Sequence, residues 1–273
     1  MSIEKNKNNI SLPSNAKISI NHCNLPASIL GGLTYNNYPV PLLLDGVNEI
    51  HKNLFDFLKI ISNFHERRSL FYEYMQAHFQ LNDLSQMGYS EDSSVNRIKI
   101  NYKRIIFGWH MNPDGLEGAV LKRWSESRFG LIPRYHKTSI RHYSDPAYES
   151  YLVTSSAGTY NTNAIEAQLD VLYSYTQFEL SLNSETHIKL YRGVNHLDEH
   201  EILNKKGNDI IILLNNINSF SSNARLAEQF GDHVLTIDVP TYKVFCFNHI
   251  LPAQINTEEE YIVIGGLYHA YLR

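Results

Sequence analysis

Three consecutive glutamates, Glu258, Glu259 and Glu260, directly precede an apolar run near the C-terminal end of the chain. Alternate side chains of a strand point to opposite faces, so we expect Glu258 and Glu260 on one face and Glu259 on the other. Two carboxylates at one strand end can act on one substrate, because one stabilises a developing cation while the other handles the incoming nucleophile. Taken alone, the three residues are better explained as a solvated acidic turn.

Two other strand ends carry polar residues that could join these carboxylates. Arg192 closes a predicted strand and Gly193 follows it. A guanidinium can clamp a phosphate, and a glycine lets a ligand approach the backbone. The structural alternative is an arginine paired with a surface acid. Ser219 follows the next predicted strand and precedes a short helix that ends at Phe230.

The elements that must position these residues fall into two halves. Apolar residues recur at three- and four-residue spacing up to residue 184, which predicts helices, and strand-like alternation follows from residue 187. The expected helices are 54–64, 70–79, 97–110, 117–129, 161–183 and 223–230. The expected strands are 187–192, 209–214, 233–239, 243–247 and 261–264, with 269–272 as a candidate last strand. Residues 21–41 are expected to be ordered loop and residues 82–94 a polar connection.

The chain has 273 residues, 43% of them hydrophobic, which is enough for a sizeable core. We expect a disordered tail over residues 1–20 and one domain over residues 21–273. Residues 21–184 of that domain are mainly helical, and residues 185–273 form its β-rich core. This distribution predicts the α+β class.

Composition and charge argue against several kinds of partner. The net charge of −4, with scattered Lys and Arg, gives no footprint for nucleic acid. The polar N-terminus lacks a secretory signal, and no apolar run is long enough to span a membrane. Only two cysteines occur, Cys23 and Cys246, which suits a reducing compartment and small buried side chains. We expect a cytoplasmic protein, with export by a machine that reads another signal left open.

Metal and dinucleotide signatures are also lacking. The 13 histidines show no metal-ligand spacing, so no metal is expected. No Gly-x-Gly-x-x-Gly follows a predicted strand, which argues against a dehydrogenase.

The order of Arg192, Ser219 and the Glu258–Glu260 pair on successive strands resembles the arginine-specific mono-ADP-ribosyltransferases. Longer segments are similar to the dinitrogenase reductase ADP-ribosyltransferase family, from about residue 21 to the end of the chain. These segments are 21–26 (NHCNLP), 117–131 (EGAVLKRWSESRFGL), 135–137 (YHK), 190–198 (LYRGVNHLD) and 260–266 (EYIVIGG). Trp124, Arg128 and Phe129 in the second segment could serve core packing or target docking, and packing is the favoured interpretation.

This resemblance implies both a fold and a reaction. The implied fold is a helical N-terminal half packed on a split, mostly antiparallel β-sandwich of ADP-ribosyltransferase type. The implied reaction moves ADP-ribose from NAD, a co-substrate, to an arginine of a target protein and releases nicotinamide. Glu260 would stabilise the oxocarbenium-like transition state through the 2′-hydroxyl of the ribose, and Glu258 would orient or deprotonate the acceptor guanidinium.

The resemblance also implies residues that bind NAD. Arg192 would bind its ribose-phosphate part, and Ser219 would hold Glu260 and the ribose in place. Gly193 would offer its backbone to the carboxamide of nicotinamide, and Phe230 would stack on the nicotinamide ring.

The target stays open at this point. It could be dinitrogenase reductase or, for an exported effector, a host metabolic enzyme such as an NAD-dependent glutamate dehydrogenase. Two alternatives of other classes are a catalytically inactive NAD-binding module and a metal-dependent hydrolase that uses some of the histidines.

Overall fold

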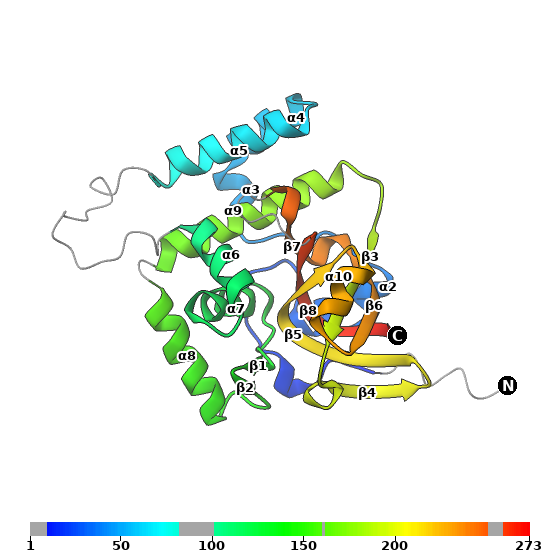
Figure 1. The fold of residues 1–273 in the computed structure, drawn as a ribbon. Helices are drawn as coiled ribbons and strands as arrows, with labels where there is room; N and C mark the ends of the chain where they lie inside the picture. Colours follow the sequence, from blue (N-terminus) through cyan, green and yellow to red (C-terminus); the bar gives the residue numbers. More distant parts are fainter. Residues whose placement is uncertain (1–9, 82–100, 160–161, 251–258) are drawn as a thin grey trace.

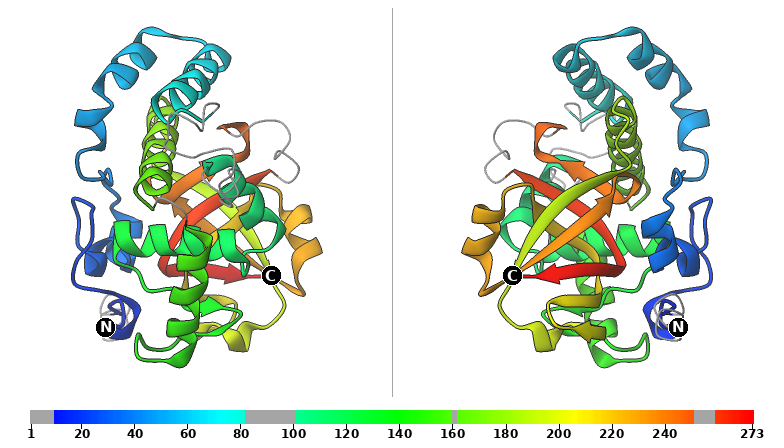
Figure 2. Two further views of the ribbon diagram at one scale, coloured as in Figure 1. Left: turned by 90° about the vertical axis from the view of Figure 1, so that its left-hand side faces the viewer. Right: turned by 90° about the vertical axis from the view of Figure 1, so that its right-hand side faces the viewer.

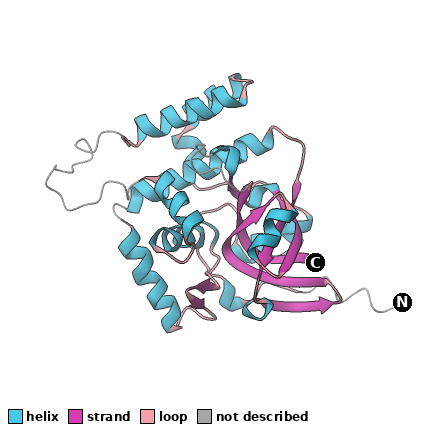
Figure 3. Cartoon of the chain, in the orientation of Figure 1, coloured by secondary structure: helices cyan, strands magenta, loops and turns pink. Residues whose placement is uncertain are grey.

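The structure, a computed structural model, describes residues 10–81, 101–159, 162–250 and 259–273. Helices dominate the chain before residue 182 and strands dominate it after residue 186, so the predicted α+β class is confirmed (Figure 1). Colouring by secondary structure shows the long strands gathered on one side of the longer helices, while the short strands β1 (Tyr135–His136) and β2 (Thr138–Ser139) lie among the helices (Figure 3).

Most of the expected helices are present. Five of them are α-helices close to the expected ranges. They are α4 (Lys52–Ile60), α5 (Phe64–His78), α6 (Tyr102–Met111), α7 (Leu116–Phe129) and α9 (Thr162–Ser181). The polar connection expected at residues 82–94 and the start of the helix expected at residues 97–110 lie outside the described residues.

Four α-helices in the described residues were not expected. The helix α8 (Pro146–Gly158) has a weak apolar pattern, because it buries only Tyr151, Ser155 and Gly158 while Val153 is exposed. The short helices α1 (Ala27–Leu30), α2 (Leu33–Asn37) and α3 (Val47–Ile50) are about one turn each. Such helices are too short for a 3.6-residue period to be visible in the sequence.

Six strands in the described residues form one antiparallel sheet, in the order β4-β5-β3-β6-β8-β7, with β5 also paired to β8. The extra pairing closes the circuit β5–β3–β6–β8 into a barrel, so the expected split sandwich is wrong. The strands are β3 (His187–Val194), β4 (Glu201–Lys206), β5 (Asp209–Ser221), β6 (His233–Pro240), β7 (Val244–Phe247) and β8 (Glu260–Leu272). The right-hand view of Figure 2 looks onto this arrangement.

The closure depends on the two 13-residue strands β5 and β8. They pair from Asp209 opposite Tyr271 to Ser221 opposite Glu260, with a register shift between Leu214 and Ile217. A β-carbon on Gly265 would lie 1.7 Å from the carbonyl oxygen of Asn215. The glycine therefore permits the close backbone approach at this bulge, where the strands bend.

The sequence-based prediction recovered both long strands only in part. The apolar run at residues 209–214 is only the first part of β5, which continues to Ser221. The two runs at residues 261–264 and 269–272 belong to the single strand β8. The strand β4 was not expected, because its side chains are largely exposed and polar, as is usual at a sheet edge.

The short helix expected at residues 223–230 is present as two pieces. They are α10 (Ala224–Ala227) and the 3₁₀ turn η5 (Glu228–Phe230), which ends before Gly231. Asn223 caps α10, because its side chain accepts a hydrogen bond from the backbone of Arg225.

Three hydrophobic clusters occur in the described residues, and the smallest packs α8 on α7 through Ala119, Ile132, Ile140 and Tyr151. The largest joins α1 to α7 and α9 to one face of the sheet and extends in sequence from Leu12 to Leu267. The second fills the barrel and includes Leu190, Val194 and Phe220. The barrel and the helices are thus packed on each other through continuous apolar contact.

Residues 10–20, which the sequence assigned to the tail, take part in this packing. Leu12 and Ala16 are buried in the largest cluster, and Lys17 forms a β-bridge with Leu131. Residues 1–9 lie outside the described residues.

The segment at residues 117–131 serves core packing. Trp124 and Phe129 are buried and their rings meet edge to face. Arg128 makes two hydrogen bonds to the carboxylate of Asp170 on α9, and Trp124 donates a third. Cys23 and Cys246 are both buried and free.

Candidate functional site

Three of the expected site residues, Arg192, Gly193 and Ser219, line one cavity of about 630 Å³. It lies where β3 ends, and its volume falls within the roughly 300–1,000 Å³ usual for small-molecule sites. Residues that the sequence put on separate strand ends therefore meet at one cavity wall.

Arg192 shares the strand face of Leu190 and Val194, whose side chains fill the barrel. Its Nη1 donates a hydrogen bond of 2.7 Å to the backbone oxygen of Ser219, while its Nε is buried without a hydrogen-bond partner among the described residues. Burial lowers the pKa of Arg192, and the charge of Glu260 opposes that effect. Arginine has an unshifted pKa above 12, so we take the guanidinium as charged, with a donor left to offer an acceptor.

Gly193 is required by packing as well as by the cavity. A β-carbon at this position would lie 2.2 Å from the backbone oxygen of Ala227, where α10 and η5 press against β3. The same β-carbon would lie 2.9 Å from the backbone carbon of Phe230. The side chain of Phe230 is 53% exposed beside the cavity rather than in its wall.

Ser219 lies inside β5 rather than after a strand end. Its Oγ accepts a hydrogen bond of 2.9 Å from the indole nitrogen of Trp109 on α6. On the neighbouring strand, Glu260 lies directly opposite Ser221. Ser219 is two residues from Ser221, so Ser219 and Glu260 share one face of the sheet.

Glu260 is the first residue of β8 and is largely buried, with 12% of its side chain exposed. Its Oε2 lies 3.4 Å from Nδ1 of His110 on α6. Glu260 also acts on Arg192 through its charge. The carboxylate therefore contacts α6, and its charge acts on the guanidinium of the cavity.

Glu259 breaks the alternation that the sequence suggested. Its φ is 48°, outside extended geometry, and its carboxylate accepts a hydrogen bond of 2.9 Å from Ser222. Strand geometry thus begins at Glu260, and the argument that alternation carries Glu258 to the same face does not hold. Glu258 lies outside the described residues.

The sequence did not point to two residues of this site, Trp109 and His110. They lie 110 and 150 residues before their partners Ser219 and Glu260. No local spacing can reveal contacts over such separations. Only the packing of α6 on the sheet brings them together.

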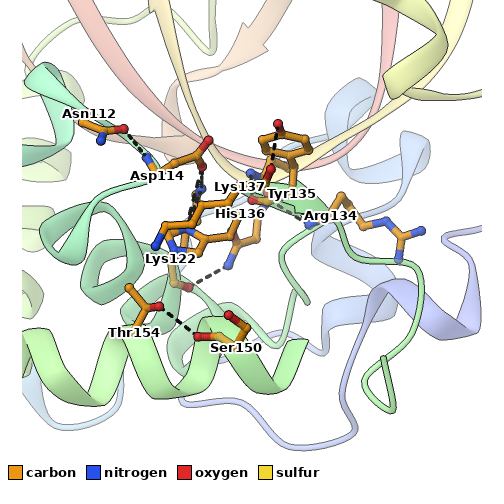
Figure 4. Close-up of polar contacts among 11 residues, drawn as sticks. Asn112, Asp114, Lys122, Arg134, Tyr135, His136, Lys137, Ser150 and Thr154 are labelled. Carbon is orange, nitrogen blue, oxygen red and sulfur yellow. Dashed lines mark hydrogen bonds and ion pairs between the residues drawn. The ribbon is translucent and has the colours of Figure 1, made fainter. Parts of the chain in front are cut away.

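A second overlooked group surrounds Lys122 on α7 (Figure 4). This lysine is 1% exposed and donates hydrogen bonds to Asp114 at 2.8 Å and to Nδ1 of His136 at 3.3 Å. Burial lowers the pKa of Lys122, and Asp114 opposes that effect. Burial and then the lysine charge lower the pKa of His136 to about 4, so His136 is neutral and can accept. Lys122 and Asp114 both line the cavity.

His200 also lines the cavity and was not singled out by the sequence. Burial, and then the charge of Arg192, lower its pKa to about 4. The imidazole is therefore neutral near pH 7, and the positive charge of this wall comes from Lys122, Arg192 and other lining residues such as Arg134.

A larger cavity of about 1150 Å³ lies toward the opposite end of β3. Its wall includes His187, Lys189 and Asp238 but none of the expected site residues. We assign the candidate site to the smaller of these two cavities. Arg192 and Ser219 line the smaller cavity, with Glu260 nearby, and none of the three lines the larger one.

No group of three or more His, Cys, Asp or Glu side chains in the described residues is arranged to hold a metal ion. Within the same residues, no helix has the length and apolar character needed to cross a membrane.

Comparisons with known proteins identify a family. The sequence profile described as dinitrogenase reductase ADP-ribosyltransferase matches residues 20–272. An NAD(+)–dinitrogen-reductase ADP-D-ribosyltransferase of Rhodospirillum rubrum is 34% identical over 257 residues, which cover 92% of this chain and 93% of the relative. No solved structure shows significant similarity to the chain.

Proposed function

The chain belongs to the dinitrogenase reductase ADP-ribosyltransferase family, and we propose that it transfers ADP-ribose from NAD to an arginine of a target protein. As a member of this family it is an NAD-dependent ADP-ribosyltransferase. In the proposed reaction, the bond between nicotinamide and the ribose breaks, and nicotinamide leaves with the bonding electrons. A guanidinium nitrogen of the acceptor then bonds to the ribose and loses a proton.

The observation that carries the proposal is the meeting of Arg192, Gly193 and Ser219 at one cavity with Glu260 close by. The motifs lie on β3, β5 and β8 in the order of the arginine-specific class. We also propose on this basis that the barrel is this family's form of the ADP-ribosyltransferase fold.

The cavity fits the chemistry of NAD. The diphosphate needs donors and positive charge, which the guanidinium of Arg192 and the ammonium of Lys122 would provide. The exposed ring of Phe230 beside Gly193 would offer a surface for stacking of the nicotinamide ring.

Glu260 is the residue we assign to the ribose. As a carboxylate in a largely buried setting, it would stabilise positive charge that develops on the ribose more strongly than it could in water. Glu258 is assigned to the acceptor, where it would orient the guanidinium and take the proton that is released. An arginine in water is protonated and a poor nucleophile, so the second step needs such a base.

Dinitrogen reductase is the first candidate target, because the Rhodospirillum rubrum relative is named for it. A host glutamate dehydrogenase serves as a comparison acceptor, since no observation on the described residues favours it.

The test separates the two chemical steps. Purified wild type, Glu258→Gln and Glu260→Gln are incubated with labelled NAD, with and without dinitrogen reductase. We expect Glu260→Gln to lose both nicotinamide release and protein labelling. We expect Glu258→Gln to lose labelling while it keeps NAD binding and slow NAD hydrolysis.

Equal labelling by wild type and Glu258→Gln would overturn the role given to Glu258. Nicotinamide release by Glu260→Gln at the wild-type rate would overturn the assignment of the site. Digestion of the labelled target and mass spectrometry would identify the acceptor residue, and a residue other than arginine would refute the proposed specificity.

A further inference from the structure

The helix α6 contacts two of the three strands that carry the proposed catalytic motif, β5 and β8. It buries Tyr102, Ile105, Ile106 and Trp109 against the rest of the molecule. Its consecutive residues Trp109 and His110 reach Ser219 on β5 and Glu260 on β8. One turn of one helix therefore contacts two site residues that lie on different strands.

We propose that Trp109 and His110 are positioning residues of the active site: Trp109 orients the hydroxyl of Ser219, and His110 holds the carboxylate of Glu260. This inference rests on the function proposed above for Ser219 and Glu260. Neither Trp109 nor His110 belongs to the motif triad, although Trp109 also lines the cavity assigned to NAD.

The chemistry of the indole fixes the direction of the first contact. An indole nitrogen can only donate a hydrogen bond, so Ser219 Oγ must be the acceptor. Trp109 is 3% exposed, so water does not compete for this bond. The hydroxyl group of Ser219 can then donate its own hydrogen bond to another acceptor. In the proposed reaction, the acceptors on this face are the carboxylate of Glu260 and a ribose oxygen.

The second contact restrains the carboxylate. The side chains of His110 and Glu260 are 16% and 12% exposed, so the contact is largely shielded from solvent. His110 can donate from Nδ1, either as the cation or as the neutral tautomer that carries its proton there. His110 also lies in the last turn of α6, where the helix dipole favours positive charge. A donor at this position holds Oε2 of Glu260 on the helix side.

The two contacts have a joint consequence. Ser219 and Glu260 lie on one face of the sheet, and α6 anchors both from that side. A shift of α6 would move the donor of the serine and the position of the carboxylate together. Sub-ångström placement of such groups controls rate more than affinity, because misplacement raises the barrier of the chemical step.

The experiment measures nicotinamide release without a protein acceptor, so that target docking cannot affect the result. Trp109→Phe keeps a buried ring but removes the donor, and we expect kcat to fall roughly tenfold, the loss of about one hydrogen bond, with KM for NAD nearly unchanged. His110→Ala should lower kcat by a similar factor. His110→Asn, which offers an amide donor close to the place of Nδ1, should recover most of the rate. Met111→Ala, an exposed neighbour on the same helix, is the control and should behave as wild type.

A double-mutant cycle separates positioning from general damage. In a Ser219→Ala background the indole has no hydroxyl to orient, so adding Trp109→Phe should cause little further loss of kcat. Fully additive losses would overturn the role of Trp109. Equal rates for His110→Ala and wild type, or no recovery by His110→Asn, would overturn the role of His110. If Trp109→Phe does not fold, as judged by circular dichroism, the His110 series decides whether α6 positions the site.

The outcomes also separate this inference from the proposed function. Wild-type nicotinamide release by both Ser219→Ala and Glu260→Gln would remove the proposed function and this inference together. Loss of activity in those two variants, with wild-type kcat in Trp109→Phe and His110→Ala, would remove this inference alone.

Discussion

At the residue scale, Arg192 combines burial with unused hydrogen-bonding capacity. One guanidinium nitrogen is fixed on the backbone of Ser219, and Nε has no partner among the described residues. A buried donor without a partner is costly, and Arg192 also lines the cavity, so we expect its guanidinium to contribute to ligand binding.

We predict that Arg192→Lys raises KM for NAD at least about tenfold. A lysine keeps the charge but loses the planar fork that holds Ser219 and a phosphate at once. The measurement is KM from nicotinamide release, and Arg225→Lys on the exposed face of α10 is the matched control. An unchanged KM in Arg192→Lys would contradict a role in NAD binding.

Lys243 is a second residue whose burial should have a measurable effect, here on the pH dependence of stability. It is completely buried, donates a hydrogen bond of 3.1 Å to the backbone oxygen of Gly265, and lies 4.5 Å from the ring centre of Tyr268. Burial lowers the pKa of Lys243 to about 7.

We predict that the free energy of unfolding rises between about pH 7 and pH 10 through Lys243. Over this interval the unfolded chain keeps a proton that the folded state has released, because an ordinary lysine pKa is about 10.4. Stability therefore increases with pH, by up to about 1.4 kcal/mol per pH unit, and the cost of burying the charge is fully present below pH 7. Urea denaturation at several pH values should show this slope in wild type and a smaller one in Lys243→Met. Identical slopes in the two proteins would contradict the prediction.

At the element scale, the contact between α5 and α9 depends on a buried ion pair. Arg67 makes two hydrogen bonds, of 2.8 and 2.7 Å, to the carboxylate of Glu179. The two side chains are only 8% and 3% exposed. Arg67 also donates to the backbone oxygens of Ile61 and Ser62, which ties the turn before α5 to the same pair.

We predict that Glu179→Gln destabilises the protein by about 3–5 kcal/mol, because it leaves the guanidinium of Arg67 buried without its counter-charge. Replacing both partners, as in Arg67→Met with Glu179→Leu, should restore much of this loss. Chemical denaturation measures both effects, and Glu73→Gln on the exposed side of α5 is the control. A loss in Glu179→Gln no larger than that of the control would show that the pair contributes little.

The elements differ in how well their sequences predict them. The helix α9 was predicted because its apolar residues recur with helical period, whereas α8 was not, since it buries few apolar side chains. The strand β4 escaped prediction for the related reason that an edge strand has no buried face to mark it.

At the scale of the whole molecule, the largest hydrophobic cluster runs from Leu12 to Leu267 and includes helices and strands alike. No apolar boundary separates the halves that the sequence distinguishes by period. We therefore propose that residues 21–273 behave as one domain, as their composition suggested.

We predict a single cooperative thermal transition for the full chain, with a calorimetric enthalpy equal to the van't Hoff enthalpy. The reason is that separating the helices from the sheet would expose most of the largest cluster. Differential scanning calorimetry tests this, and two resolved transitions would indicate that the halves unfold independently.

The sequence was enough to predict the class of the fold, most helices, and three residues of one cavity, Arg192, Gly193 and Ser219. Local periodicity and the order of motifs are properties of the chain itself, so they can be recognised without coordinates. The sequence did not predict the barrel, because its closure depends on the pairing of β5 with β8 and on the close backbone approach at Gly265. These are contacts between strands that lie far apart in sequence.

The surroundings of the proposed active site show most clearly what the sequence determined and what only the tertiary structure decided. The order of the motifs and the longer similar segments indicated the family, and this resemblance implied the chemistry to expect. The tertiary structure alone decided that α6 reaches Ser219 and Glu260, and that alternation ends at Glu260. The physical reason is that hydrogen bonds and backbone angles depend on three-dimensional packing, which joins residues more than 100 positions apart.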